Sequence, residues 1–217
     1  MKKMMTMLLA VALLLTAAAC GAQGTATSQS NVVTNAQPTP APDVSFDLLD
    51  EAVIYYADIE IADYGTVTVV LDQGAAPVTA ANFVNLAKNG FYDGLTFHRI
   101  ISGFMIQGGD PKGNGTGGSD TRIVGEFAAN GHNNPISHDR GVISMARSQN
   151  YNSASSQFFI MHADAAYLDG QYAAFGYVTE GMDVVDAVCA AAKPTDNNGS
   201  IARENQPVIT SVTIREE

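Results

Sequence analysis

The sequence predicts a mainly β domain that closes into an antiparallel barrel and contains only two proper helices. Three observations indicate this class: an alternating pair of strands near residue 60, short strands broken by Gly and Asn over most of the remaining chain, and only two stretches with helical spacing. Many strands and few helices favour a sheet that curls on itself, because closure buries one face and removes exposed edges.

The first elements are a hairpin and a helix. Residues 52–61 and 66–71 alternate between apolar and polar side chains and flank a turn at 63–65, which predicts two antiparallel strands. Residues 78–88 follow Pro77 and place apolar side chains at helical spacing, with an Asn-Gly pair directly after them. Pro before and Gly after such a stretch are typical helix boundaries, so we expect a helix here.

The second helix and the last strand lie near the C-terminus. Met182–Ala191 has an apolar face formed by Val184, Val185, Val188 and Cys189. Residues 208–214 alternate again and predict the final strand. Cys189 has no neighbouring His or basic residue that would lower its pKa, so we expect it to be a buried small hydrophobic residue and not a nucleophile.

Residues 1–19 are interpreted as a targeting segment. Two lysines precede an apolar run at 4–16, and three alanines ending at Ala19 precede Cys20. The run is shorter than the about twenty residues that a membrane-spanning helix needs. Cys20 directly after the small residues predicts a bacterial lipoprotein signal with Cys20 as the lipidated residue, although such signals usually have Leu where Ala17 stands. The alternative is an ordinary secretory peptide cut after Ala19.

The mature chain is expected to consist of a tether and one domain. Residues 20–45 are rich in Ala, Thr, Ser, Gln, Asn and Pro and show no periodicity, which predicts a disordered tether. Such a tether would span roughly 25–30 Å. Residues 46–217 are long enough for a domain with its own core. We expect this domain outside the cytoplasm, anchored to the membrane as a lipoprotein or, alternatively, secreted in soluble form.

The acidic net charge makes some classes of partner unfavourable. The formal net charge is −11, and it becomes −13 once Lys2 and Lys3 are removed with the signal. An acidic surface disfavours nucleic acid and anionic lipid, so the membrane would be reached only through the N-terminal lipid. We expect a monomer.

No metal or cofactor is expected. The histidines at 98, 132, 138 and 162 lack zinc-ligand spacing, and His98 is interpreted as a hydrogen-bonded structural residue. The glycines at 113, 115 and 118 fit the spacing of a dinucleotide fingerprint, but no helix is predicted after them. Residues 196–199 are typical of a turn and lack the later ligands of a calcium loop.

The segment FHRIISGFMIQGGD at 97–110 carries the strongest functional signal. Arg99 and Gln107 stand among apolar residues. Placing such side chains on an apolar surface costs free energy unless their polar groups have a function there. Phe104 and Met105 supply an aromatic ring and a flexible thioether. Together these residues predict a peptide-binding pocket for a small apolar group, with one charged donor.

This segment resembles the signature of the cyclophilins, which are peptidyl-prolyl cis-trans isomerases. The resemblance continues in the family's order through NGTGG at 114–118, GEF at 125–127, ISMAR at 143–147, SQFFI at 156–160, YLDG at 167–170 and FGYV at 175–178. It implies an eight-stranded antiparallel barrel capped by a helix at each end, and an isomerase that assists the folding of secreted or surface proteins. The alternative is a proline-peptide binding module or chaperone with incidental turnover.

The resemblance also implies the site residues. Arg99 and Gln107 would be catalytic, and the substrate would contact Phe104, Met105, Gly115, Ala146, Arg147, Gln157, Phe159, Tyr167, Leu168 and Tyr172, with Ala146 and Arg147 acting through their backbone. Two positions depart from the best-known members, which have Trp where Tyr167 stands and His where Tyr172 stands. The loop at 149–155 is also slightly longer. The partners would be proline-containing peptides and unfolded secreted proteins.

Each of these residues also has a purely structural interpretation. Phe104, Met105, Phe159 and Leu168 could belong to the core, and Arg99 could form a structural ion pair with one of the many acidic residues. The two interpretations differ in where the side chains lie, which the sequence alone leaves open.

Overall fold

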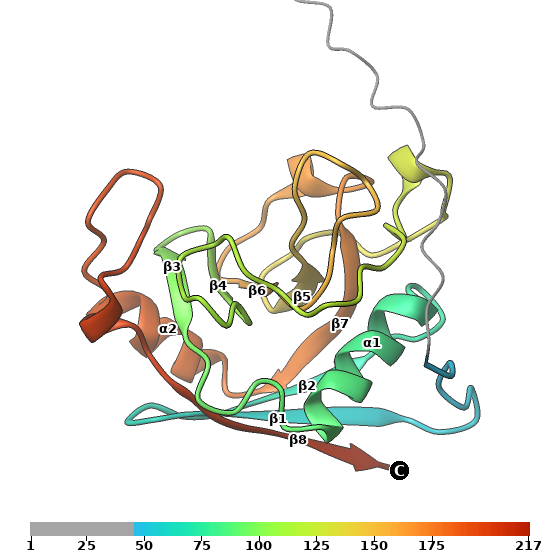
Figure 1. Cartoon of the computed structure of the whole chain (residues 1–217), viewed down its shortest axis with the longest axis horizontal. Coiled ribbons are helices and arrows are strands. Elements are labelled where there is room, and N and C mark those ends of the chain that lie inside the picture. Colours follow the sequence, from blue (N-terminus) through green and yellow to red (C-terminus); the bar gives the residue numbers. More distant parts are fainter. Residues whose placement is uncertain (1–45) are drawn as a thin grey trace, which may run out of the picture. The chain divides into compact units, whose positions relative to one another are not determined.

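The computed structural model describes residues 46–217, which form one mainly β domain (Figure 1). The predicted signal peptide, tether and lipidated Cys20 lie outside the described residues. Within residues 46–217 no helix combines the length and the apolar character needed to cross a bilayer.

Eight antiparallel strands form one sheet in the order β3-β4-β6-β5-β7-β2-β1-β8. The strands are β1 (Tyr55–Ile61), β2 (Gly65–Leu71), β3 (Phe97–Ile101), β4 (Met105–Gly108), β5 (Val142–Met145), β6 (Phe158–Met161), β7 (Ala173–Glu180) and β8 (Ile209–Glu216). The helices are α1 (Pro77–Lys88) and α2 (Met182–Ala191), and three short 3-10 turns are η1 (Ala128–Asn130), η2 (Ala166–Leu168) and η3 (Arg203–Asn205). The mainly β, eight-stranded class is confirmed.

The prediction of a closed barrel is overstated, because the sheet is a curled half-barrel. Its edge strands β3 and β8 meet only through the isolated bridge between Thr96 and Val208 and a few bonds beside it, such as Ile209 N–H to Leu95 C=O at 2.7 Å. Further along β3, Ile201 donates to the carbonyl of His98 at 2.9 Å. The loop before β8 thus occupies the edge of β3 that β8 would need for a continuous ladder.

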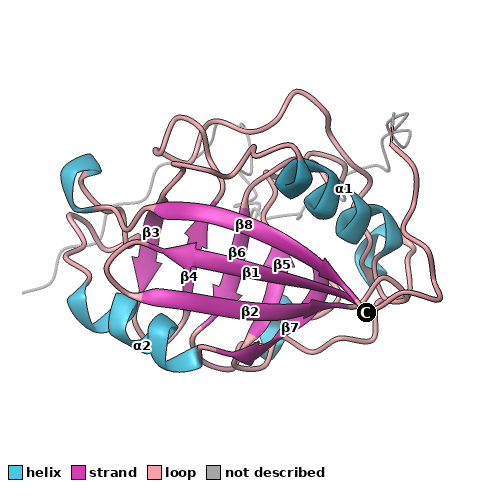
Figure 2. Cartoon of the chain, turned by 90° about the horizontal axis from the view of Figure 1, so that it is seen from below, coloured by secondary structure: helices cyan, strands magenta, loops and turns pink. Residues whose placement is uncertain are grey.

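The predicted hairpin and both helices are confirmed. In the hairpin, Ile61 of β1 lies opposite Gly65 of β2. The two helices cover opposite ends of the curled sheet, and β8, β1 and β2 cross in front of β3, β4, β6 and β5 (Figure 2). Cys189 on α2 is buried, and burial raises the pKa of its thiol to about 11, so the prediction of an inert hydrophobic residue holds.

Two apolar clusters lie on opposite faces of the sheet. The larger one fills the concave interior, where Phe83 of α1 packs against the rings of Tyr92, Phe158 and Phe175 at centroid distances of 5.1–5.4 Å. The smaller cluster includes Phe159, the next residue along β6. Because successive side chains of a strand point to opposite faces, β6 contributes to both clusters. The smaller cluster faces outward and carries the candidate site.

Candidate active site

The pairing of the strands brings three of the predicted residues into one row across the sheet. Arg99 of β3 lies opposite Gln107 of β4, and Gln107 lies opposite Phe159 of β6. Ser144 of β5 continues the row on the other side of Phe159. Residues that lie directly opposite each other present their side chains on the same face of a sheet. The cationic, amide and aromatic side chains therefore share one outward face.

A cavity of about 160 Å³ opens on this face. It is lined by nine of the twelve predicted residues: Arg99, Phe104, Met105, Gln107, Ala146, Arg147, Phe159, Leu168 and Tyr172. Met105, Phe159 and Leu168 are buried and form its floor, and Phe104 is half-buried. They belong to the smaller apolar cluster, so they pack against the rest of the domain and still line an open cavity.

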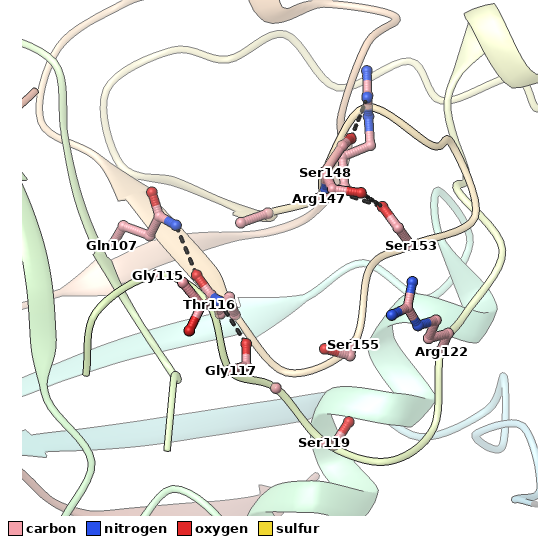
Figure 3. Close-up of a pocket in the computed structure, with 13 residues that line it drawn as sticks. Gln107, Gly115, Thr116, Gly117, Ser119, Arg122, Arg147, Ser148, Ser153 and Ser155 are labelled. Atoms are coloured by element: carbon pink, nitrogen blue, oxygen red, sulfur yellow. Dashed lines mark hydrogen bonds between the residues drawn. The ribbon is translucent and has the colours of Figure 1, made fainter. Parts of the chain in front are cut away.

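The other three predicted residues lie beside this cavity. Gly115 and Gln157 line a neighbouring polar cavity of about 280 Å³, which also contacts Gln107 and Arg147 (Figure 3). Tyr167 is 71% exposed, and its ring lies 6.0 Å from that of Phe104. Tyr167 is thus placed at the rim, where a bound molecule could cover it.

Arg99 is held without any acidic partner among the described residues. Its Nε donates to the carbonyl of Asn198 at 2.7 Å, and its Nη1 donates to Oε1 of Gln107 at 3.2 Å. Its guanidinium also lies 5.9 Å from the ring centre of Phe104. Nη1 also lies 3.9 Å from Sδ of Met105. The structural alternative of an ion pair is therefore wrong, since these contacts go to neutral oxygen and sulfur atoms and leave the charge uncompensated.

Gln107 belongs to a chain of side-chain amides that orients Arg99. Its Nε2 donates to Oε1 of Gln157 at 2.9 Å, and Nε2 of Gln157 donates to the carbonyl of Gly117 at 2.7 Å. This chain fixes which end of each amide faces which neighbour. Oε1 of Gln107 is thereby directed at the guanidinium of Arg99.

The segment after β5 presents backbone groups to the cavity. The N–H of Ala146 is bonded to the carbonyl of Gln157 at 2.9 Å, whereas the carbonyl of Ala146 and the N–H of Arg147 have no hydrogen-bond partner within residues 46–217. Such groups can pair with an extended peptide in the manner of an added strand.

The side chain of Arg147 takes part in the architecture of the site. Its guanidinium lies 4.9 Å from the ring centres of Phe127 and Tyr151 and 4.7 Å from that of Tyr172. Its Nε also donates to the carbonyl of Gln171 at 2.9 Å. Because Tyr172 lines the apolar cavity, Arg147 joins the loop that contains Tyr151 to the cavity wall.

Behind the apolar cavity lies a buried hydrogen-bonded set that the sequence did not reveal. His138 is fully buried; its Nδ1 bonds Oδ1 of Asp169 at 2.9 Å and its Nε2 bonds Oγ of Ser144 at 3.0 Å. This order of groups resembles a hydrolase triad, but Ser144 is also fully buried and cannot reach a substrate. The ring of His138 instead stacks on Phe159 at 6.0 Å, so the set supports the cavity floor.

Burial has the largest effect on the pKa of His138. Desolvation lowers its pKa, and the hydrogen bond and charge of Asp169 oppose this without reversing it. Burial alone would raise the pKa of Asp169, but hydrogen bonds from His138 bring it below its usual value. The pair is therefore a neutral imidazole beside a carboxylate near neutral pH.

The loop after β4 is organised by Asp110, the last residue of the predicted signature. This carboxylate is fully buried and accepts N–H bonds from Lys112, Asn114 and Gly115 at 2.8, 3.0 and 2.6 Å. Burial by itself would raise the pKa of Asp110, but these backbone donors lower it overall. The loop that carries Gly115 is thus fixed by an ionised side chain.

The prediction for His98 is wrong in one respect. His98 is buried, but neither ring nitrogen has a hydrogen-bond partner among the residues described. Burial lowers its pKa, and the nearby charge of Asp110 opposes that shift. Residues 196–199 form the predicted turn. The turn also holds Arg99 in place, because the carbonyl of Asn198 accepts a hydrogen bond from it, which the sequence did not indicate.

No cluster of three or more His, Cys, Asp or Glu side chains able to hold a metal ion occurs within residues 46–217.

Comparisons with known proteins agree on one family. The family model described as cyclophilin type peptidyl-prolyl cis-trans isomerase/CLD matches residues 56–215. A peptidyl-prolyl cis-trans isomerase of Helicobacter pylori strain J99 is 43% identical over 151 residues, which cover 68% of this chain and 90% of that protein. Peptidyl-prolyl cis-trans isomerase B of Bacillus subtilis strain 168 is 49% identical over 109 residues, covering 50% of this chain and 73% of that protein.

Solved structures give the same result. A cyclophilin type peptidyl-prolyl cis-trans isomerase of Cryptosporidium parvum superposes with a TM-score of 0.66 at 28% identity, covering 76% of this chain and 99% of that one. A second structure of that protein, determined in the presence of the dipeptide Ala-Pro, has a TM-score of 0.65 at 29% identity and covers 75% of this chain and 99% of that one.

Proposed function

Because this chain belongs to the cyclophilin-type peptidyl-prolyl cis-trans isomerases, we propose that it isomerises Xaa-Pro bonds of secreted or surface proteins outside the cytoplasm, with Arg99 as the charged donor. The isomerase activity is that of the family whose model spans residues 56–215. The residue roles, the substrates and the location are the proposed parts.

The observation that carries the role of Arg99 is its charge, which is uncompensated at the edge of an apolar cavity. Rotation about an Xaa-Pro bond meets a barrier of about 18–20 kcal/mol, because the planar imide has partial double-bond character. Twisting the bond localises a lone pair on the prolyl nitrogen. A guanidinium N–H directed at that nitrogen stabilises the twisted form and not the planar one, as catalysis requires.

A single hydrogen bond from Arg99 is not sufficient to account for a large acceleration of isomerisation. An acceleration of about 10⁵ requires roughly 7 kcal/mol, whereas a hydrogen bond to a charged group contributes about 1.5–3 kcal/mol. The remainder would come from holding the proline ring on Met105, Phe159 and Leu168 and from pairing the flanking backbone with Ala146 and Arg147. These groups are held in place before the substrate arrives, so little reorganisation opposes the reaction.

The proposed location depends on the N-terminal segment. The apolar run at 4–16 and the small residues before Cys20 support export followed by lipid attachment at Cys20. A lipidated, tethered monomer would then encounter unfolded chains as they emerge from export. Proline-containing segments of such chains are the proposed substrates.

The test is turnover of a short Xaa-Pro peptide by the purified protein, measured as the rate of cis-to-trans conversion without added metal or nucleotide. We expect acceleration over the spontaneous reaction, which takes tens of seconds or longer. Binding of the peptide without acceleration would favour the alternative of a proline-binding module.

A further inference from the structure

Acidic and basic side chains are distributed unevenly over this domain. Of the 11 Lys and Arg residues, Lys2 and Lys3 belong to the N-terminal segment, which leaves nine. Three of these form ion pairs with acidic residues: Lys88 with Glu216, Arg140 with Asp186, and Arg215 with Asp58 and Glu217. The other six have no acidic partner within residues 46–217, although the chain contains twice as many acidic as basic residues.

Five of these six unpaired cations line one groove, by which we mean the three cavities that share Gln107 in their lining. Three cavities contact Gln107: the apolar one, the polar one of about 280 Å³, and a third of about 740 Å³ on the side of Arg99. The five cations that line them are Arg99, Lys112, Arg122, Arg147 and Arg203, and Lys193 is the one that lies elsewhere. No Asp or Glu lines any of the three cavities.

The third cavity places two cations near each other and beside a buried histidine. Lys112 and Arg203 both line it, and the guanidinium of Arg203 packs so closely over Gly113 that a side chain at Gly113 would collide with it. His98 lines the same cavity with both ring nitrogens buried and unpartnered in the described part of the chain. This wall thus contains a polar ring and two positive charges that form no ion pair or side-chain hydrogen bond within residues 46–217.

The polar cavity has its own free cation. Arg122 makes no ion pair or side-chain hydrogen bond with any of residues 46–217, and it lines this cavity together with Ser153 and Ser155 (Figure 3). Arg147 differs, because its charge is already covered by three aromatic rings and by backbone carbonyls. Arg122 is therefore the cation of this cavity that remains available to a ligand.

We propose that the groove selects proline segments with acidic side chains near the proline, with Arg122 in the polar cavity and Lys112 with Arg203 in the third cavity as the contacts. This proposal rests on the proposed isomerase function and names its substrate class. The lining of this groove contains no carboxylate, and the charge of Asp110 near His98 is buried and held by backbone N–H donors. On an otherwise acidic protein such a lining attracts a carboxylate locally and repels a lysine or arginine at the same position. Charge complementarity of this kind sets specificity more than total affinity.

The test is a series of Xaa-Pro peptides that carry Glu, Gln or Lys at each of three positions before and after the proline. We expect kcat/KM at low salt to be about twofold to thirtyfold higher for Glu than for Lys at the positions that reach these cations, since partly exposed charge pairs have modest energies. The ratio should shrink in about 0.5 M salt, which screens exposed charges.

Charge reversal then assigns the contacts. Arg122→Glu and Lys112→Glu should each lower the Glu-to-Lys ratio, at different peptide positions, and Lys193→Glu is the matched control because it makes the same charge change outside the groove. Equal kcat/KM for Glu, Gln and Lys peptides, or an equal change in all three variants, would overturn the proposal and leave the isomerase function intact. If no peptide is turned over, the proposed function fails, and peptide affinities measured by fluorescence anisotropy decide the charge preference by the same criteria.

Discussion

Nη1 of Arg99 donates a hydrogen bond of 3.2 Å to Oε1 of Gln107, its direct neighbour across β3 and β4. The other end of the same amide donates to Gln157, so Gln107 cannot rotate without losing one of two bonds. The side chain proposed as the donor is thus oriented by the sheet itself, and its charge is not cancelled by an acid.

Replacing Arg99 by Ala should remove most of the isomerase activity. Loss of a hydrogen bond from a charged donor costs about 1.5–3 kcal/mol in the twisted state, which is roughly tenfold to more than a hundredfold in kcat/KM. Folding should persist, because Arg99 is only partly buried. Peptide turnover and thermal unfolding measure the two effects. Arg140→Ala, which removes an Arg outside the groove, is the control, and an Arg99→Ala enzyme as fast as the parent would refute the mechanism.

Replacing Arg147 by Ala should weaken both stability and substrate binding. Its guanidinium lies against three rings, so the free energy of unfolding should fall by about 1–3 kcal/mol. Because Tyr172 loses this support, KM should rise more than kcat falls. Urea unfolding and steady-state kinetics test this. Arg122→Ala removes an Arg without such contacts and should change stability by less than about 0.5 kcal/mol; equal losses in both variants would contradict the role given to the rings.

The free energy of unfolding should decrease as the pH falls from about 7.5 toward 5. Burial lowers the pKa of His138 in the folded protein, so the unfolded chain, with an ordinary pKa of about 6.5, binds the proton more readily. The stability is therefore fully present above the unfolded pKa and is lost as the pH falls toward the folded one. His98 contributes in the same direction.

His138→Gln separates the two histidines. The variant should show a smaller pH slope of stability than the parent, with the remaining slope due in part to His98. Urea unfolding at several pH values between 5 and 7.5 gives the slopes, and the overall loss of stability from the substitution does not affect the comparison. Identical slopes would show that His138 does not titrate differently in the two states.

Replacing Cys20 by Ala should release the protein from the membrane fraction. In the parent, fatty-acyl label should appear on the mature amino terminus, because the lipid is the proposed anchor. Cell fractionation and metabolic labelling measure both. A parent protein that is soluble and unlabelled would instead mean ordinary signal-peptide cleavage after Ala19.

The local elements could be predicted because neighbouring residues encode them. The hairpin near residue 60, the helical spacing after Pro77 and the bounds of Met182–Ala191 agree with the structure, although the first strand begins at Tyr55 and not at residue 52. The candidate pocket was also foreseeable in part, since Arg99, Phe104, Met105 and Gln107 lie within one short segment that forms β3, β4 and their turn.

The tertiary structure alone decided the features that join distant segments. Nothing near Arg99 in the sequence indicates that the Asn198 carbonyl will hold it, or that Asp169 will bond the buried His138. The opening of the barrel and the gathering of unpaired cations around Gln107 likewise depend on the paths of the loops. Periodicity and turn chemistry act over a few residues, whereas partners separated by 30 to 100 positions are chosen only when the sheet sets its register and the whole chain packs.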